Sequence, residues 1–259
     1  MQPSITWIGH STVLIELDGV RLLTDPLLRP RVAHLRRAVA APNRIEGELD
    51  AILLSHVHYD HLDVPSLRRV EAAQVIAPRG AGRVLGRNGF AGVIELGEGD
   101  EIALGSVAVV ATRAEHSARR GPFSGPSPAL GYLIGGSARV YFAGDTDLFA
   151  EMHALRPGLD VALLPVWGWG HRLPPGHLDP RRAAEALRLL APRVAIPIHW
   201  GTYRRVGSSR DPAVLREPAE RFEQLAAELA PEVTVRVLAP GERIEIPLAS
   251  ASEAGDGRA

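Results

Sequence analysis

The sequence predicts a single α/β domain in which two β-rich halves are covered by helices. Short apolar runs separated by turns recur from residue 5 to residue 246, and amphipathic helical patterns stand between some of them. The chain has 259 residues, 46% of them hydrophobic and 23% charged, as is usual for a globular protein with a sizeable core. It shows no internal repeat and no long linker. We therefore expect one domain over residues 1–248 and a disordered tail over residues 249–259.

The first half of the chain has the pattern of a β-sheet. Asp18-Gly19 stands between two apolar runs and predicts a hairpin, because both residue types accept the positive φ of a tight turn. The run Ala-Ile-Leu-Leu at 51–54 is apolar throughout and predicts a buried strand. The strands expected in this half are 5–8, 12–17, 20–24, 51–54, 75–77 and 93–96.

The second half repeats this pattern. Gly135-Gly-Ser137 predicts the turn of a further hairpin, and glycine-rich turns separate the preceding runs. The strands expected here are 101–104, 107–112, 130–134, 139–143, 161–166, 194–198, 233–238 and 243–246.

Fewer segments have helical signals. Asp179-Pro180 is a capping residue followed by proline, the order typical of a helix start. Asp147 is the expected cap of a helix over 148–155. The last expected helix places apolar residues on one face. The five expected helices cover 65–70, 80–87, 148–155, 181–190 and 218–229.

Composition excludes several kinds of chemistry. The chain has no cysteine, so it forms no disulfide, and any metal must be held by His, Asp or Glu. All 29 basic residues are arginine, which excludes a Schiff-base lysine. The net charge is −1 with no basic run, so we expect no nucleic-acid partner. No apolar span of 18 residues and no signal peptide are recognisable, so we expect a soluble cytoplasmic protein without a transmembrane segment.

The stretch Ser55-His-Val-His-Tyr-Asp-His61 concentrates three of the ten histidines in six residues. His56 and His58 are two residues apart, so an extended segment points both rings the same way. Asp60 and His61 follow a turn and can face a second point nearby. One ion rarely takes four ligands from so short a stretch, whereas two adjacent ions can share it. Imidazole and carboxylate without thiolate suit Zn²⁺, Mn²⁺ or Fe.

Three further candidate ligands follow other expected strands. They are His116, Asp145 in the segment Ala-Gly-Asp-Thr, and His199 in the segment Pro-Ile-His-Trp-Gly-Thr. Taken singly, each is explained by an ordinary loop or turn. Sites in α/β proteins form where strand ends converge, and four ligand-bearing loops therefore predict one metal centre.

These residues, in type and in order, resemble the metallo-β-lactamase superfamily from about residue 5 to residue 246. Within it, the chain resembles the N-acylphosphatidylethanolamine phospholipase D-like branch, which is close to the ascorbate-phosphate lactonase-like proteins. The segments that carry the resemblance are Trp-Ile-Gly-His-Ser-Thr-Val-Leu-Ile-Glu (7–16), Leu-Thr-Asp-Pro (23–26), Ser-His-Val-His-Tyr-Asp-His-Leu-Asp (55–63), Phe-Ala-Gly-Asp-Thr (142–146), Gly-His-Leu-Asp-Pro (176–180) and Ile-His-Trp-Gly-Thr-Tyr (198–203).

The resemblance implies a four-layer αββα sandwich with a dinuclear site at one edge of its sheets. It implies that one group of ligands holds the first metal and another the second, with Asp145 between the two ions. The expected ions are two Zn²⁺, with Mn²⁺ or Fe as alternatives. By position in the motifs, the first group is His56, His58 and His116, and the second is Asp60, His61 and His199.

The expected function is that of a dinuclear metal-dependent hydrolase that uses a bridging hydroxide. Five neutral imidazoles, two carboxylates and two divalent ions sum to about +2, and a hydroxide lowers this to about +1. Such a centre attracts a small anionic or ester substrate and stabilises the charge that develops during attack. A phosphodiester is the expected substrate, and a lactone or other ester is the alternative. A non-catalytic metal-binding protein is the less favoured reading, because all seven ligands are present.

Other residues have weaker signals. Asp25 is expected behind the ligands, where it orients one of them, although an Asp-Pro turn explains it equally well. His10 and His177 are candidate catalytic residues alongside Asp60, each able to give a hydrogen bond or a proton to the leaving group. Arg119-Arg120 is a candidate phosphate clamp. The four tryptophans flank the motifs, as pocket walls or, for Trp7 and Trp200, as core. The oligomeric state is not predicted.

Overall fold

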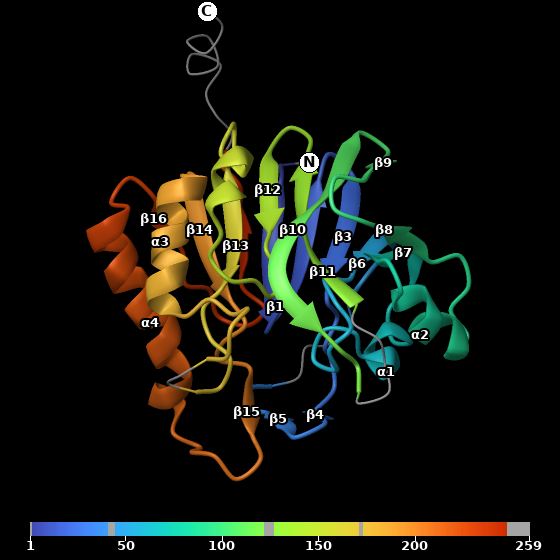
Figure 1. The fold of residues 1–259 in the computed structure, drawn as a ribbon, viewed down its shortest axis with the longest axis horizontal. Helices are drawn as coiled ribbons and strands as arrows, with labels where there is room; N and C mark the ends of the chain where they lie inside the picture. The colour runs from blue at the N-terminus through green and yellow to red at the C-terminus, as the bar shows by residue number, and fades with distance from the viewer. Residues whose placement is uncertain (1, 41–44, 122–126, 171–172, 248–259) are drawn as a thin grey trace, which may run out of the picture.

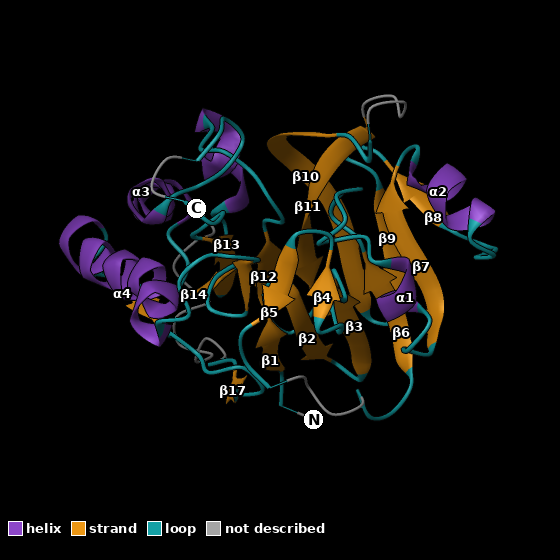
Figure 2. Cartoon of the chain, turned by 90° about the horizontal axis from the view of Figure 1, so that it is seen from below, coloured by secondary structure: helices purple, strands orange, loops and turns teal. Residues whose placement is uncertain are grey.

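The computed structural model shows two mixed β-sheets packed face to face with helices on both outer sides (Figure 1 and Figure 2). It describes residues 2–40, 45–121, 127–170 and 173–247, so the expected tail over 249–259 lies outside the described residues. Both sheets have seven strands, and a small third sheet lies at one end of the sandwich. The expectation of an α/β fold with a four-layer αββα arrangement is confirmed.

The first sheet has the strand order β17-β1-β2-β3-β6-β7-β8. The strands from β17 to β3 pair antiparallel, while β3, β6, β7 and β8 pair parallel. The turn Asp18-Gly19, with φ of 51° and 84°, closes the expected hairpin between β2 and β3. The strands are β1 (Ser4–Gly9), β2 (Thr12–Leu17), β3 (Val20–Thr24), β6 (Leu49–Leu53), β7 (Ala72–Pro78), β8 (Ile94–Leu96) and β17 (Arg243–Glu245).

The second sheet has the order β16-β14-β13-β12-β11-β10-β9. The strands from β9 to β12 pair antiparallel, and β12, β13, β14 and β16 pair parallel. Every residue of β13 and β14 is buried, as expected of parallel strands covered on both faces. The strands are β9 (Glu101–Leu104), β10 (Val107–Ala118), β11 (Ser127–Gly135), β12 (Arg139–Phe142), β13 (Val161–Pro165), β14 (Val194–Ile198) and β16 (Thr234–Val235).

The remaining elements cover the sheets. Helices α1 and α2 lie on the first sheet and α3 and α4 on the second, and the small sheet β15-β5-β4 closes one end (Figure 1). Among the described residues, every helix is too short or too polar to cross a bilayer. These elements are α1 (Val64–Leu67), α2 (Ala81–Arg87), the 3₁₀ helix η1 (Ala150–Leu155), α3 (Pro180–Leu190), α4 (Pro212–Leu229), β4 (Arg31–Val32), β5 (Leu35–Arg37) and β15 (Tyr203–Arg205).

Alternation along the strands of the first sheet builds two cores. In β6, Ala51 and Leu53 pack into the large cluster shared by the two sheets and α3 and α4. Their neighbours Ile52 and Leu54 pack into a smaller cluster under α1 and α2. Because successive side chains of a strand point to opposite faces, one apolar run supplies both layers. The sandwich therefore holds this sheet from both sides.

Several elements differ from the expectations, and some strands and helices have other bounds than expected. Strand β10 continues six residues beyond residue 112 and contains His116, because it pairs with β11 as far as Ala118. Helix α4 begins at Pro212, capped by Asp211, so the Pro218 expected at its start lies inside it. Residues 150–155 form a 3₁₀ helix. The small sheet was not expected.

Parallel pairing determines where the site lies. The carboxyl ends of neighbouring parallel strands share one edge of a sheet. Asp25 follows β3 and the 55–61 stretch follows β6, while Asp145 follows β12 and His199 follows β14. The face-to-face packing of the sheets brings these ends together at the end of the sandwich that the small sheet covers (Figure 1).

Candidate metal centre

The stretch after β6 folds into a compact turn. The backbone N–H groups of His61 and Leu62 donate to the His58 carbonyl, at 3.1 Å and 2.8 Å. Arg120 Nη1 donates to the carbonyls of Val57 (2.9 Å) and Leu62 (2.8 Å). Its guanidinium also lies 4.4 Å from the centre of the Tyr59 ring. Arg120 therefore holds this turn in shape, which differs from its expected role as a free phosphate clamp.

The first group of candidate ligands converges as expected. His58 Nδ1 lies 2.9 Å from His56 Nε2 and 3.2 Å from His116 Nε2. His116 comes from β10 of the second sheet, whereas the other two follow β6 of the first. His116 Nδ1 donates to the Gly176 carbonyl at 2.8 Å, which leaves its Nε2 lone pair free for a cation.

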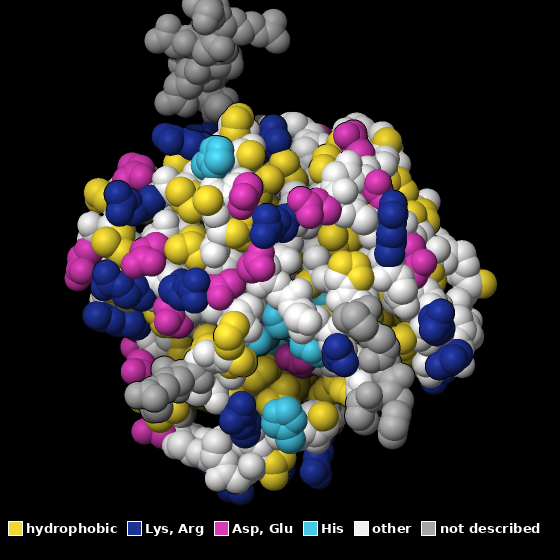
Figure 3. All heavy atoms as spheres, in the orientation of Figure 1, with side chains coloured by type: hydrophobic (Ala, Val, Ile, Leu, Met, Phe, Trp, Pro, Cys, Tyr) yellow, Lys and Arg dark blue, Asp and Glu magenta, His cyan; other side chains and the backbone are white. Residues whose placement is uncertain are grey.

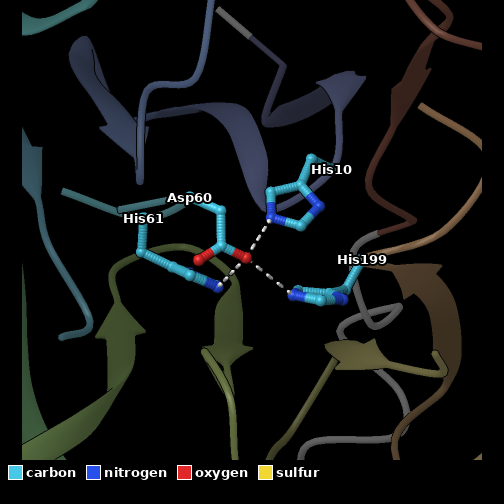
Figure 4. Close-up of side chains that lie close together, drawn as sticks. All are labelled: His10, Asp60, His61 and His199. Atoms are coloured by element: carbon cyan, nitrogen blue, oxygen red, sulfur yellow. Dashed lines mark ion pairs between the residues drawn. The ribbon is translucent and has the colours of Figure 1, made fainter. Parts of the chain in front are cut away.

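The second group gathers around one carboxylate oxygen, as Figure 4 shows. His61 Nε2 and His199 Nε2 lie 3.6 Å and 3.7 Å from Asp60 Oδ2. His10 was not expected in this group, yet its Nε2 lies 3.3 Å from the same oxygen. The His10 side chain is only 1% exposed, so it is buried in this group like His61 and His199.

Asp145 lies between the two groups. Its Oδ2 is 3.3 Å from His61 Nε2 and 3.9 Å from His56 Nε2, and its Oδ1 is 3.4 Å from His199 Nε2. The preceding Gly144 has φ of +60°, and a Cβ there would lie 2.6 Å from the Ser55 Cβ. Glycine thus lets the loop after β12 approach the loop after β6 closely.

Asp25 orients histidines of both groups. Its Oδ2 accepts hydrogen bonds from His61 Nδ1 (2.7 Å) and from the Ser55 hydroxyl (2.5 Å). The Ser55 hydroxyl in turn lies 2.9 Å from His56 Nδ1. With both Nδ1 atoms donating, the Nε2 atoms of His56 and His61 are left as acceptors towards the centre. The Ser55 N–H donates to the other oxygen of Asp25 at 2.7 Å.

His177 lies at the edge of the centre. Its Nε2 is 3.8 Å from Asp145 Oδ2, and its ring centre is 4.8 Å from that of His116. Its Nδ1 donates to the Pro174 carbonyl at 3.1 Å. With 19% of its side chain exposed, His177 is open to a molecule entering the site.

Burial favours the neutral form of several histidines here. It lowers the pKa of His58 to about 4 and that of His10 to about 3, helped by neighbouring His116 and His199 respectively. Burial also holds the pKa of His56 well below its usual value. Neutral imidazoles are the form that binds metal ions.

Opposite charges act on the remaining groups. Burial alone would raise the pKa of Asp145, but His199 and His61 hold it well below its usual value. Burial would likewise lower the pKa of His61, but Asp145 and Asp60 raise it well above its usual value. The pKa of Asp60 is likewise held well below its usual value despite burial. The carboxylates of Asp145 and Asp60 are therefore negatively charged and create a strong field for a cation.

The unpaired atoms fit metal ions. Five buried atoms at the centre have no hydrogen-bond partner among the described residues: His10 Nε2, His61 Nε2, Asp145 Oδ1, His199 Nδ1 and His199 Nε2. Buried polar atoms without partners are rare and costly. Four groups of candidate ligands overlap through His56, His61, His116 and Asp145. Nitrogen and carboxylate donors without thiolate suit zinc or another transition metal.

A small cavity opens beside the centre. It has a volume of about 220 Å³ and is lined in part by His34, His58, Tyr59 and Asp60. Figure 3 looks into a hollow in which histidine and carboxylate side chains are visible. The side chain of Asp60 is 18% exposed. A small substrate can thus reach the edge of both groups.

The tryptophans separate into two kinds. Trp7 and Trp200 are buried and stacked, with ring centres 4.9 Å apart, so the expectation that they belong to the core is confirmed. Trp169 packs against His199, with ring centres 5.0 Å apart, and lines a cavity of about 450 Å³ together with Trp167. Trp169 therefore lies between His199 and this cavity.

Comparison with known proteins shows the family to which this chain belongs. Residues 20–200 match the model of the β-lactamase superfamily domain. A UPF0173 metal-dependent hydrolase of Methanopyrus kandleri is 32% identical, over 93% of this chain and 99% of its own. A phospholipase D of Caenorhabditis elegans that hydrolyses N-acyl-phosphatidylethanolamine is 32% identical, over 76% of this chain and 64% of its own. The structure of Igni18, a metallo hydrolase from Ignicoccus hospitalis, superposes with a TM-score of 0.71 at 26% identity, covering 96% of this chain and 100% of that one.

The chain therefore belongs to the β-lactamase superfamily, which confirms the resemblance found in its motifs. It is a metal-dependent hydrolase.

Sequence reasoning missed the supporting roles of two residues at the candidate centre. Ser55 links Asp25 to His56, and Arg120 ties the turn that carries the ligands. A serine directly before the first histidine is a weak signal, because serine is common in loops. The partners of Arg120 are backbone carbonyls 58 and 63 residues away, which no local pattern indicates.

Proposed function

We propose that the protein is a dinuclear metal hydrolase that cleaves phosphodiesters. The observation that supports it most is the position of Asp145, within 3.3–3.9 Å of donor nitrogens in both histidine groups. In this proposal His56, His58 and His116 hold the first ion, and Asp60, His61 and His199 hold the second. Zn²⁺ suits these donors best, with Mn²⁺ or Fe as alternatives.

The ions would supply Lewis acidity and a water of lowered pKa. The chain's own residues supply position and proton transfer. His177 gives the proton on its Nε2 to the leaving group in its doubly protonated form, because Nε2 faces the centre while Nδ1–H donates to the Pro174 carbonyl, and it regains a proton from the attacking water. Asp60 borders the small cavity and orients the attacking water by accepting a hydrogen bond.

The proposed substrate is small and anionic. Two dications offset by two ligand carboxylates leave a positive centre that attracts a phosphate. The relative from Caenorhabditis elegans is named for phospholipase D activity, which favours a phosphodiester over a lactone or a simple ester. The cavity of about 220 Å³ beside Asp60 limits the size of the reacting group.

A comparison of substrates tests this function. The protein would be freed of metal, reloaded with Zn²⁺ or Mn²⁺, and assayed with bis(p-nitrophenyl) phosphate, p-nitrophenyl acetate, a lactone and an N-acyl phospholipid. We expect metal-dependent turnover of the phosphodiester. Turnover of the lactone or acetate alone would replace this substrate class with esters, and a loaded protein inert towards all four would contradict the proposal.

A further inference from the structure

His10 faces the same point as the candidate ligands of the second ion. Its Nε2 is 3.3 Å from Asp60 Oδ2, closer than the Nε2 atoms of His61 (3.6 Å) and His199 (3.7 Å). Figure 4 shows the three imidazoles arranged around this oxygen from different elements. His10 follows β1, His61 follows β6 and His199 follows β14.

These spacings are those of donors around an ion. A Zn–N bond of about 2.0–2.1 Å places neighbouring donors of a tetrahedron roughly 3.4 Å apart. Hydrogen bonds from nitrogen to oxygen are shorter, about 2.7–3.2 Å. The distances of 3.3–3.7 Å to Asp60 Oδ2 thus agree better with shared coordination than with hydrogen bonding.

Burial removes the other partners that His10 needs. Its Nε2 is buried and has no hydrogen-bond partner among the described residues, like the Nε2 atoms of His61 and His199. A histidine that only filled space behind the ligands would leave this buried polar atom unpaired, which is unfavourable. One cation at the convergence point satisfies all three nitrogens.

The backbone is built to hold His10 in this position. His10 has φ of +55°, a strained conformation for a non-glycine residue that is frequent at functional sites. Its N–H donates to Thr202 Oγ1 at 2.7 Å. Its carbonyl accepts from Trp7 Nε1 (2.9 Å) and from the N–H of His199 (3.0 Å). The strained segment is therefore tied directly to an expected ligand.

We propose that His10 is an additional ligand of the second metal ion, beside Asp60, His61 and His199. This rests on the proposed dinuclear centre and goes beyond it, because the motif pattern gives the second ion only those three residues and Asp145. The second ion then has three imidazoles and two carboxylates, whereas the first has three imidazoles and one carboxylate. The first ion is the one with more room for exchangeable water or substrate.

Metal retention without any substrate tests this assignment. His10→Phe keeps a ring of similar size against His199 and removes the donor nitrogen. His10→Asn removes the imidazole with a residue that accepts positive φ. His153→Phe, at an exposed histidine on η1, is the control. Each protein would be loaded with Zn²⁺, desalted and analysed for bound metal, and titrated with Co²⁺ by visible absorption.

We expect two ions per chain in wild type and His153→Phe, and one in both His10 variants. The second Co²⁺ should bind at least tenfold more weakly in them, with a changed absorption band. Two ions and an unchanged Co²⁺ spectrum in either folded His10 variant would overturn the proposal. A wild type that retains only one ion would overturn the dinuclear centre and this ligand with it. An inactive wild type with two ions would contradict the hydrolase function alone.

Discussion

His61 Nδ1 lies 2.7 Å from Asp25 Oδ2, and both side chains are fully buried. The same oxygen accepts the Ser55 hydroxyl, which lies against His56 Nδ1. One carboxylate on the first sheet therefore fixes a histidine in each ligand group. Asp25 follows β3, which pairs with β6 in the first sheet, and this places the carboxylate beside the histidine motif that follows β6.

Asp25→Asn should weaken both metal sites. The amide keeps the shape but loses the charge and one acceptor, so His61 and His56 lose their common orientation. Loss of such a supporting group reduces metal affinity by about 10–100-fold. Competition titration with a chelator measures the metal affinity. Asp50→Asn, an exposed change on β6, is the control, and equal affinities in the two variants would refute the orienting role.

Asp145→Ala and His199→Ala should differ in metal content. Asp145 lies next to donors of both groups, so its loss should remove both ions. His199 contributes to the second group alone, so its loss should leave one ion. Elemental analysis of the desalted proteins gives the number of bound ions per chain. Full metal content in Asp145→Ala would mean that this carboxylate does not bridge.

His177→Gln should lower kcat without removing metal. A proton donor contributes about 10²–10⁴-fold to rate, and more for a leaving group that needs the proton. The loss should therefore be large for an alkyl phosphodiester and small for a nitrophenyl one. The kcat values of wild type and variant on the two substrates measure this difference. Metal content is the control. Equal losses for both leaving groups would exclude this role.

Gly144→Ala should destabilise the fold and disturb the centre. The new Cβ would lie 2.6 Å from the Ser55 Cβ, and the alanine would have to adopt a φ of +60°. Gly158→Ala is a matched control, because its φ is +67° with no atom within 4 Å of the added Cβ. Strain alone costs about 1–2 kcal/mol, or roughly 2–8 °C in Tm. We expect Gly144→Ala to exceed that and Gly158→Ala to match it, and equal melting temperatures would contradict the close approach.

Asp18→Asn should lose stability only at higher pH. Hydrogen bonds from the Ser137 hydroxyl and N–H lower the pKa of Asp18 in the folded state. Stability from a lowered pKa is fully present above about pH 4, the unfolded value, and is lost as pH falls through the folded value. Because Asp18 is exposed, the deficit in Tm at pH 7 should be only roughly 1–2 °C.

Melting curves of Asp18→Asn and wild type from pH 2 to pH 7 check this dependence. The two proteins should converge at the acid end, since Asp18 is then protonated whether folded or unfolded. A deficit that persists unchanged to the lowest pH would show that shape rather than charge is responsible. Ser137→Ala, which removes the hydroxyl donor, should show the same pH trend with a smaller deficit.

The sequence was sufficient for features that depend on local pattern. The buried strand at 51–54 follows from an unbroken apolar run, and the hairpin turn at 18–19 follows from the backbone freedom of Asp-Gly. The candidate ligands His56, His58, Asp60 and His61 are concentrated in one stretch, so their type and spacing are visible without a structure.

Other features depend on pairing between distant segments. Strand β10 reaches Ala118 only because β11 pairs with it, with an irregularity between Arg113 and Ser117. The small sheet joins β5 to β15, more than 160 residues later. Pro218 indicated a helix start, yet α4 begins at Pro212 with Asp211 as its cap and contains Pro218 as a buried residue. The proposed role of His10 as a metal ligand is visible only in the structure, because it depends on three distant chain segments that approach one another.

The dependence of hydrolysis on bound metal tests the central claim most directly. Metal-free protein would be titrated with Zn²⁺ while the initial rate on bis(p-nitrophenyl) phosphate is recorded. The dinuclear account predicts that the rate rises until two equivalents per chain are bound and then stays constant. A full rate at one equivalent, or no hydrolysis once two equivalents are bound, would contradict it.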